Sequence, residues 1–125
     1  MPSVLIVDDD LLYRGLMVEV LRLEGFQVEE AHSRVSALRV LESKPTFEVV
    51  LCDLQMDGMD GVDLLKTLRA EYPRVAVVVV SAHSAEHGAG ATARAYATEY
   101  LNKPFSITKL VNTIRKVSEC SSQGV

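Results

Sequence analysis

The chain has 125 residues, 48% of them hydrophobic and 24% charged, which is the composition of one ordinary globular domain. Its formal net charge of −4 argues against nucleic-acid binding as the main role, because a phosphate backbone attracts a basic surface. With only two cysteines and no apolar run near the roughly 20 residues that span a bilayer, we expect a cytoplasmic domain without disulfide bonds, signal peptide or membrane partner.

Five short apolar runs predict β-strands. Val4–Val7 opens the chain and is followed by Phe26–Ala31 and Phe47–Cys52. Val75–Val80 is apolar on both faces and rich in β-branched residues, which is typical of a strand covered on both sides in a parallel sheet. The last run, Glu99–Leu101, is the weakest of the predicted strands.

The segments between these runs show the helical spacing of apolar residues. Gly25 is expected to end the first helix, and the third should stop before Pro73. Ser33 and Ser106 precede two other helical segments and are suited to cap their N-termini. The helix expected over residues 84–96 is the weakest, because each of its two glycines costs about 1 kcal/mol relative to alanine.

Strands that alternate with helices predict a βα repeat, and therefore a parallel sheet with helices on both faces. The predicted fold class is α/β, a three-layer (βα)5 arrangement around a doubly wound five-stranded sheet. One domain is expected over residues 1–120, followed at residues 121–125 by a disordered tail or the start of a linker.

Polar side chains follow four of the predicted strands, at the edge where sites form in open parallel sheets. Residues that are far apart in the sequence would therefore meet in space. They are Asp8, Asp9 and Asp10 after the first run, Asp53 after the third, Ser81 after the fourth and Lys103 after the fifth.

This set of side chains predicts phosphoryl chemistry. Neighbouring carboxylates repel one another unless a cation joins them, and a hard divalent ion such as Mg²⁺ resolves that repulsion. A carboxylate such as Asp53 can attack phosphorus, while Lys103 would supply fixed positive charge and Ser81 a hydrogen bond. Taken alone, the three consecutive aspartates are equally consistent with a solvated turn, Ser81 is more often structural and Lys103 is more often a surface lysine, whereas an unpaired Asp53 near a core would be costly. The combination favours a phosphoryl site.

The chain resembles the receiver domain of two-component response regulators over residues 3–118. The resemblance is carried by VLIVDDD at the first strand, DLQMDGMDG from Asp53, VVVVSA ending at Ala82, and EYLNKPF around Lys103. Each motif alone is weak, but the four together are specific to this family. The resemblance implies a flavodoxin-like strand order of 2-1-3-4-5.

The resemblance implies that Asp53 is the phosphoacceptor and that Lys103 pairs with the phosphoryl oxygens. The domain would catalyse only its own phosphorylation and dephosphorylation, and is otherwise not expected to be an enzyme. Mg²⁺, for which Mn²⁺ or Ca²⁺ could substitute, is expected at Asp8, Asp9, Asp53 and the backbone carbonyl of Gln55.

The resemblance also implies residues that change position when the domain is phosphorylated or that set how long the phosphoryl group lasts. Ser81 and Tyr100 are expected to move together once the phosphoryl group is present, with the tyrosine turning inward. Gln55 and His83 occupy positions that tune the lifetime of the acyl phosphate in similar proteins. The peptide bond before Pro104 is expected to be cis and to orient the preceding lysine.

Two positions depart from the family pattern. Asp57 stands where the family usually has proline, which adds a carboxylate near the mouth of the site. Tyr96 stands where the family usually has glycine in a left-handed, helix-ending conformation. We therefore expect strain or a changed connection within residues 84–101, on a face that passes on the signal in the family.

The expected partner is a sensor histidine kinase or a histidine phosphotransfer protein. The sequence does not identify the output partner, direct nucleic-acid binding is not expected, and a homodimer through the 84–120 face stays open. A receiver-like interaction domain that is not regulated by phosphorylation is the alternative, which Tyr96 keeps open. A phosphatase is disfavoured by Gln55, where an acidic residue is usual, and a nucleotide or flavin module by the lack of a glycine-rich first loop.

Overall fold

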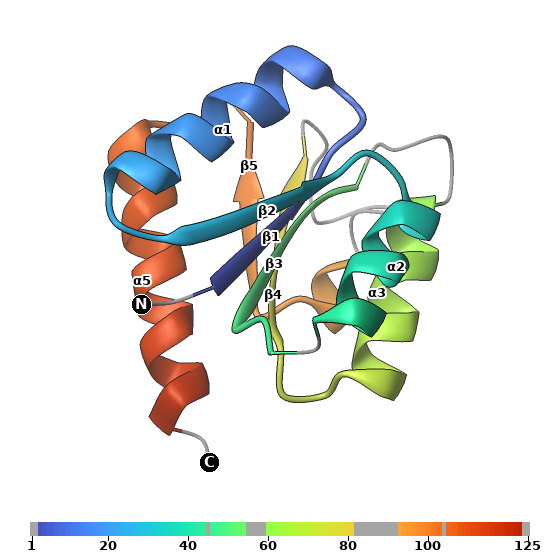
Figure 1. The fold of residues 1–125 in the computed structure, drawn as a ribbon. Helices are drawn as coiled ribbons and strands as arrows, with labels where there is room; N and C mark the ends of the chain where they lie inside the picture. The colour runs from blue at the N-terminus through green and yellow to red at the C-terminus, as the bar shows by residue number, and fades with distance from the viewer. Residues whose placement is uncertain (1–2, 45, 55–59, 82–92, 104, 124–125) are drawn as a thin grey trace.

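The computed structural model describes residues 3–44, 46–54, 60–81, 93–103 and 105–123, of which 60, 61 and 119–123 are described at the backbone only. A five-stranded parallel sheet forms its centre, as the βα alternation predicted, and has the order β2-β1-β3-β4-β5 that the family resemblance implied (Figure 1). The strands are β1 (Ser3–Val7), β2 (Gln27–Ala31), β3 (Val49–Asp53), β4 (Ala76–Ser81) and β5 (Glu99–Asn102).

Helices cover both faces of this sheet and complete the three-layer α/β fold. Figure 1 shows α1 and α5 on one face, with α2 and α3 on the other. Residues 93–96 are also helical. Among the described residues, no helix combines the length and apolar character needed to cross a membrane. The labelled helices are α1 (Leu11–Leu23), α2 (Arg34–Ser43), α3 (Asp60–Glu71) and α5 (Ile107–Gln123).

The alternation of side chains along the strands divides the core into two layers. In β1, Val4 and Ile6 pack with the α1 and α5 side, while Leu5 and Val7 pack with the α2 and α3 side. Every residue of β4 is buried, as its uninterrupted apolar run predicted. Burial on both faces explains why the three central strands, β1, β3 and β4, lack the polar alternation of a half-exposed strand.

The predicted helix signals are confirmed where the structure describes them. Ser33 caps α2 by accepting a hydrogen bond from the backbone N–H of Ser36 at 3.2 Å. Ser106 accepts one from the backbone N–H of Lys109 at 3.0 Å at the start of α5. Gly25 has a φ of 95° just after α1, a conformation that favours glycine.

The end of α5 differs from the prediction. The helix runs to Gln123, so residues 121–123 are helical where the sequence predicted a tail. No proline or glycine occurs between Ile107 and Gly124, and each residue added to a formed helix gains a hydrogen bond. Polar composition alone was therefore a poor guide to the helix end.

The segment at Tyr96 is connected to the rest of the domain by side-chain hydrogen bonds. Arg69 of α3 donates from Nε to the carbonyl of Tyr96 at 2.6 Å and from Nη2 to Oγ1 of Thr98 at 3.0 Å. Thr98 is in turn bonded to both backbone groups of Val77, at 2.7 and 3.0 Å. These bonds join the segment before β5 to α3 and β4. Residues 84–92 of the expected helix lie outside the described residues.

Candidate functional site

The carboxyl ends of the strands bring the predicted polar residues to one edge of the sheet. Asp53 is the last residue of β3 and pairs with Val80 of β4. Ser81, the last residue of β4, is buried and pairs with Asn102, which precedes Lys103. The backbone N–H of Lys103 also donates to the carbonyl of Ser81 at 2.7 Å. The register of the parallel sheet thus delivers these residues together.

Lys103 and Asp53 form an ion pair at this edge. Nζ of Lys103 lies 2.8 Å from Oδ2 of Asp53, and the two side chains are 22% and 6% exposed. Burial lowers the pKa of Lys103, but the hydrogen bond and negative charge of Asp53 outweigh it, and the pKa is raised overall. The lysine is therefore a fixed cation beside a largely buried carboxylate.

Asp8 adds a second buried carboxylate. Its side chain is fully buried, and Oδ1 accepts a hydrogen bond from the backbone N–H of Asp10 at 2.9 Å. Oδ2 is buried without a hydrogen-bond partner among the described residues. The pKa of Asp8 is raised to about 6, mainly by burial and also by the charge of Asp53, against the opposing effect of the hydrogen bond from the backbone N–H of Asp10.

The oxygen groups at this edge are suited to a hard divalent cation. An unsatisfied carboxylate oxygen beside a second carboxylate is costly in isolation and is what such a cation would satisfy. Asp9, the third predicted ligand, is exposed. Within the described part of the chain, no three His, Cys, Asp or Glu side chains converge as a metal cluster. Gln55, whose carbonyl was the fourth predicted ligand, lies outside that part.

Other predicted residues are only partly placed. Tyr100 is half-buried on β5 and packs against the core layer under α2 and α3. Asp57, Ala82, His83 and Pro104 lie outside the described residues, so their roles stay predictions.

Three structural roles near the site, one of them that of the candidate residue Asp10, were not predicted from the sequence. Asp10 caps α1 by accepting hydrogen bonds from the backbone N–H groups of Leu12 and Tyr13. Nη1 of Arg14 donates to the carbonyl of Asp8 at 2.6 Å, which fixes the backbone below that carboxylate. The ring of Tyr13 lies beneath Nζ of Lys103, 4.2 Å from the ring centroid. An aspartate before a helical segment was a recognisable cap signal, whereas the other two contacts depend on folding.

Comparison with known families agrees with this arrangement. The family model of the response regulator receiver domain matches residues 4–115. The chain belongs to this family. It is therefore a signalling domain of the two-component type, and the family resemblance seen in the sequence is confirmed.

Curated relatives of this receiver domain are longer proteins. A putative response regulator NtrX-like of Rickettsia bellii is 34% identical over 119 residues, which cover 94% of this chain and 25% of the relative. The transcriptional regulatory protein ZraR of Salmonella typhimurium is 34% identical over 114 residues, which cover 91% of this chain and 26% of the relative. The receiver domain thus spans about a quarter of the length of these proteins.

Solved structures share the fold. The receiver domain of NtrX from Brucella abortus has a TM-score of 0.85 at 27% identity, covering 93% of this chain and 98% of that one. The response regulator TrrA of Thermotoga maritima, solved with Mg²⁺ and BeF, has a TM-score of 0.83 at 26% identity, covering 94% and 99%. A CheY-like receiver domain protein from Methanospirillum hungatei JF-1 has a TM-score of 0.91 at 23% identity, and the match covers 100% of this chain and 99% of that one. At this identity the likeness shows the fold alone.

Replacement of Asp8 by asparagine is expected to stabilise the metal-free receiver domain at neutral pH. Because the folded-state pKa of about 6 lies above the ordinary 3.8, the folded wild type binds more protons between these values. Its stability therefore falls as pH rises through this window, and an uncharged amide avoids that loss. We expect the free energy of unfolding to rise by about 2 kcal/mol at pH near 7.5 and to change little near pH 4. Urea unfolding in the presence of a chelator measures both values.

Asp9→Asn is the matched control for this prediction. Asp9 is adjacent in the chain but exposed, so its charge has no comparable desolvation penalty. An equal gain in stability from both substitutions, or a gain from Asp8→Asn that does not change with pH, would contradict the interpretation that the buried charge of Asp8 destabilises the fold.

Proposed function

We propose that this receiver domain accepts a phosphoryl group on Asp53 and that the modification switches the face formed by residues 84–120. The observation that carries the proposal is the 2.8 Å contact between Lys103 and Asp53 at the sheet edge, beside the buried Asp8. It supports a nucleophile and a fixed cation in one place. The alternative of an interaction domain without phosphorylation explains neither the contact nor the buried acidic pair.

The proposed transfer is a nucleophilic displacement at phosphorus. A carboxylate oxygen of Asp53 attacks the phosphorus of a phosphohistidine; an O–P bond forms, the P–N bond breaks, and the leaving imidazole takes up a proton. The ammonium of Lys103 donates a hydrogen bond to a phosphoryl oxygen as charge builds there. In the separate dephosphorylation reaction, water attacks phosphorus, the bond to Asp53 breaks, and inorganic phosphate leaves while the carboxylate is regenerated.

The proposal includes Mg²⁺, or Mn²⁺ or Ca²⁺ in its place. Oδ2 of Asp8, which lacks a hydrogen-bond partner within the described part of the chain, and the neighbouring Asp53 support binding there, with Asp9 and the carbonyl of Gln55 as the further expected ligands. A bound cation would neutralise the acidic residues and the incoming phosphoryl oxygens.

The later steps of signalling are part of the same proposal. Ser81 and Tyr100 would change position together, which shifts a pre-existing equilibrium of the domain. Gln55 and His83 would tune the lifetime of the acyl phosphate, and a cis bond before Pro104 would orient the lysine. The phosphodonor would be a sensor histidine kinase or a phosphotransfer protein, and the output partner or a second copy of the chain would read the 84–120 face.

Acetyl phosphate tests the central step without a cognate kinase. Incubation with this donor and Mg²⁺ is expected to add one phosphoryl group, detected by intact mass. The added group should be removed by hydroxylamine, because an acyl phosphate reacts with this nucleophile and a phosphoserine does not. No mass gain, or a gain that resists hydroxylamine, would overturn the proposal.

A further inference from the structure

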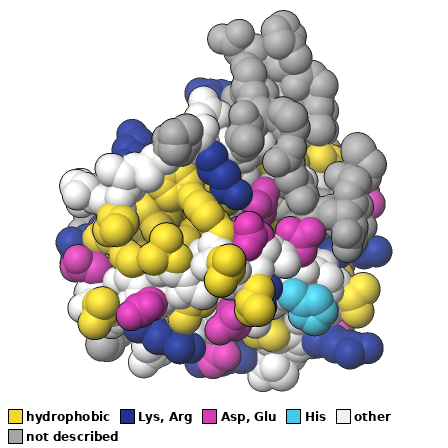
Figure 2. Space-filling view, turned by 90° about the horizontal axis from the view of Figure 1, so that it is seen from above, with side chains coloured by type: hydrophobic (Ala, Val, Ile, Leu, Met, Phe, Trp, Pro, Cys, Tyr) yellow, Lys and Arg dark blue, Asp and Glu magenta, His cyan; other side chains and the backbone are white. Residues whose placement is uncertain are grey.

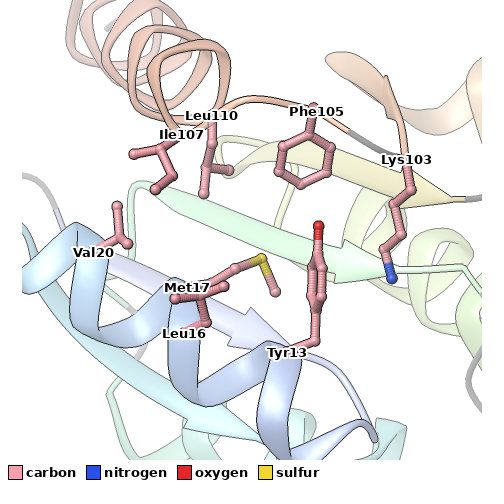
Figure 3. Close-up of a pocket in the computed structure, with 8 residues that line it drawn as sticks. All are labelled: Tyr13, Leu16, Met17, Val20, Lys103, Phe105, Ile107 and Leu110. Carbon is pink, nitrogen blue, oxygen red and sulfur yellow. The ribbon is translucent and has the colours of Figure 1, made fainter.

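The ammonium of Lys103 is held from two sides by residues on different elements. Asp53 at the end of β3 accepts its hydrogen bond at 2.8 Å. On the other side, the ring of Tyr13 in the first turn of α1 places its centroid 4.2 Å from Nζ, within the range of a cation–π interaction. In Figure 3, the lysine amine ends beside the tyrosine ring.

The tyrosine ring is itself fixed in place. The backbone N–H of Tyr13 donates to Oδ1 of the capping Asp10 at 3.2 Å, which sets the start of α1. Its ring meets that of Phe105 edge to face, with centroids 6.2 Å apart and an interplanar angle of 87°. Figure 3 shows its hydroxyl directed toward Phe105 rather than toward the lysine. The ring face, not the hydroxyl, is therefore the group presented to the ammonium.

An apolar pocket of about 440 Å³ between α1 and α5 lies beside this contact. It is lined by the Tyr13 ring and by aliphatic side chains such as Leu16 and Leu110 (Figure 3). Figure 2 shows hydrophobic side chains gathered next to acidic and basic ones on this upper face. On the pocket side the lining is apolar, so the ring face meets the ammonium away from bulk water, while the carboxylate acceptors lie on the opposite side with Asp53.

We propose that Tyr13 is a positioning residue, whose ring face holds the Lys103 ammonium at the phosphoryl site. A lysine side chain has four flexible methylene groups, so an ammonium held by a single contact also populates rotamers that point away from the phosphoryl group. A second anchor of fixed geometry keeps it where charge develops during transfer. This inference rests on the proposed function of Asp53.

The two anchors differ in how they respond to phosphorylation. When Asp53 becomes an acyl phosphate, the carboxylate oxygens lose their full charge and the bond to Lys103 changes. The ring of Tyr13 is unaffected by that chemistry. It therefore keeps the ammonium beside the phosphoryl oxygens both before and after transfer, which would serve formation and hydrolysis of the acyl phosphate alike.

Replacing Tyr13 with phenylalanine and with leucine separates the ring from its hydroxyl and from simple packing. Tyr13→Phe keeps a ring face and is expected to be phosphorylated by saturating acetyl phosphate at the wild-type rate. Tyr13→Leu fills similar space without a π-system and is expected to be slower by about threefold to tenfold. Leu16→Ala, from the same pocket, is the matched control and should keep the wild-type rate.

Nuclear magnetic resonance of the lysine side chains tests the contact independently of phosphorylation. With ¹³C-labelled lysine, the ε-methylene protons of Lys103 should be shifted upfield by the ring in the wild type and in Tyr13→Phe, but not in Tyr13→Leu. Equal phosphorylation rates in the leucine and phenylalanine variants, or a wild-type Lys103 without the upfield shift, would overturn the proposal. A wild type that shows the shift but gains no phosphoryl group would refute the function of Asp53 and leave only the contact.

Discussion

Asp53→Asn is expected to abolish the phosphoryl gain from acetyl phosphate. An amide nitrogen or oxygen is a far weaker nucleophile toward phosphorus than a carboxylate, so no transfer to this position is expected within the assay. The substitution keeps the size of the side chain, and its carbonyl oxygen can still accept the hydrogen bond from Lys103 that now spans 2.8 Å. Loss of activity should therefore occur in a folded protein, as measured by intact mass and urea unfolding.

The stability of Asp53→Asn reflects two opposing effects. The ion pair with Lys103 is lost, which destabilises the fold. The repulsion that Asp53 exerts on the buried Asp8 is also lost, which stabilises it. We expect the net change in the free energy of unfolding to stay within about 1 kcal/mol, since removal of one charge from a site with two acids and one base has compensating effects.

Asp63→Asn is the matched control for this loss. Asp63 is exposed on α3, and its substitution should leave the phosphoryl gain unchanged. A mass gain that persists in Asp53→Asn would place the phosphoryl group elsewhere and refute the proposed acceptor.

The strand core was predictable because its physical signal is local. An uninterrupted apolar run such as Val75–Val80 has few uses other than burial on both faces, and β4 is buried along its whole length. The residues at which strands begin and end were less predictable. Phe47 is buried yet precedes β3, which begins at Val49, because an apolar residue can enter the core from a loop as well as from a strand.

The site was predictable in its parts but not in its contacts. Parallel strands end at a common edge, so Asp53, Ser81 and Lys103 could be brought together by topology alone. The unequal burial of Asp8 and Asp9 could not be predicted in this way. Successive residues after a strand point in different directions, and whether each is buried depends on how α1 packs. The contact between Tyr13 and Lys103 joins α1 to the residue that follows β5, and no local pattern encodes a pair so far apart in the sequence.

Lys103→Met is expected to slow formation of the acyl phosphate by about 100-fold. The methionine keeps much of the aliphatic stem but removes the ammonium that would stabilise the phosphoryl oxygens, and loss of one such preorganised donor typically has an effect of this order. The measurement is the rate of mass gain with saturating acetyl phosphate. Lys109→Met, an exposed position in the first turn of α5, is the control and should retain the wild-type rate.

The same substitution should also make stability more sensitive to pH. The charge of Lys103 lowers the pKa of Asp8, so its removal raises a pKa that is already about 6. A higher folded-state pKa means that stability is lost as pH rises, and two largely buried acids without a nearby cation are expected to cost about 1–3 kcal/mol at pH near 7.5. Acidification toward pH 5 should restore much of that loss, because protonation removes one of the two charges. A Lys103→Met protein with wild-type stability at both pH values would show that the ammonium does not balance the acidic pair, and would remove the electrostatic basis for its role in phosphoryl transfer.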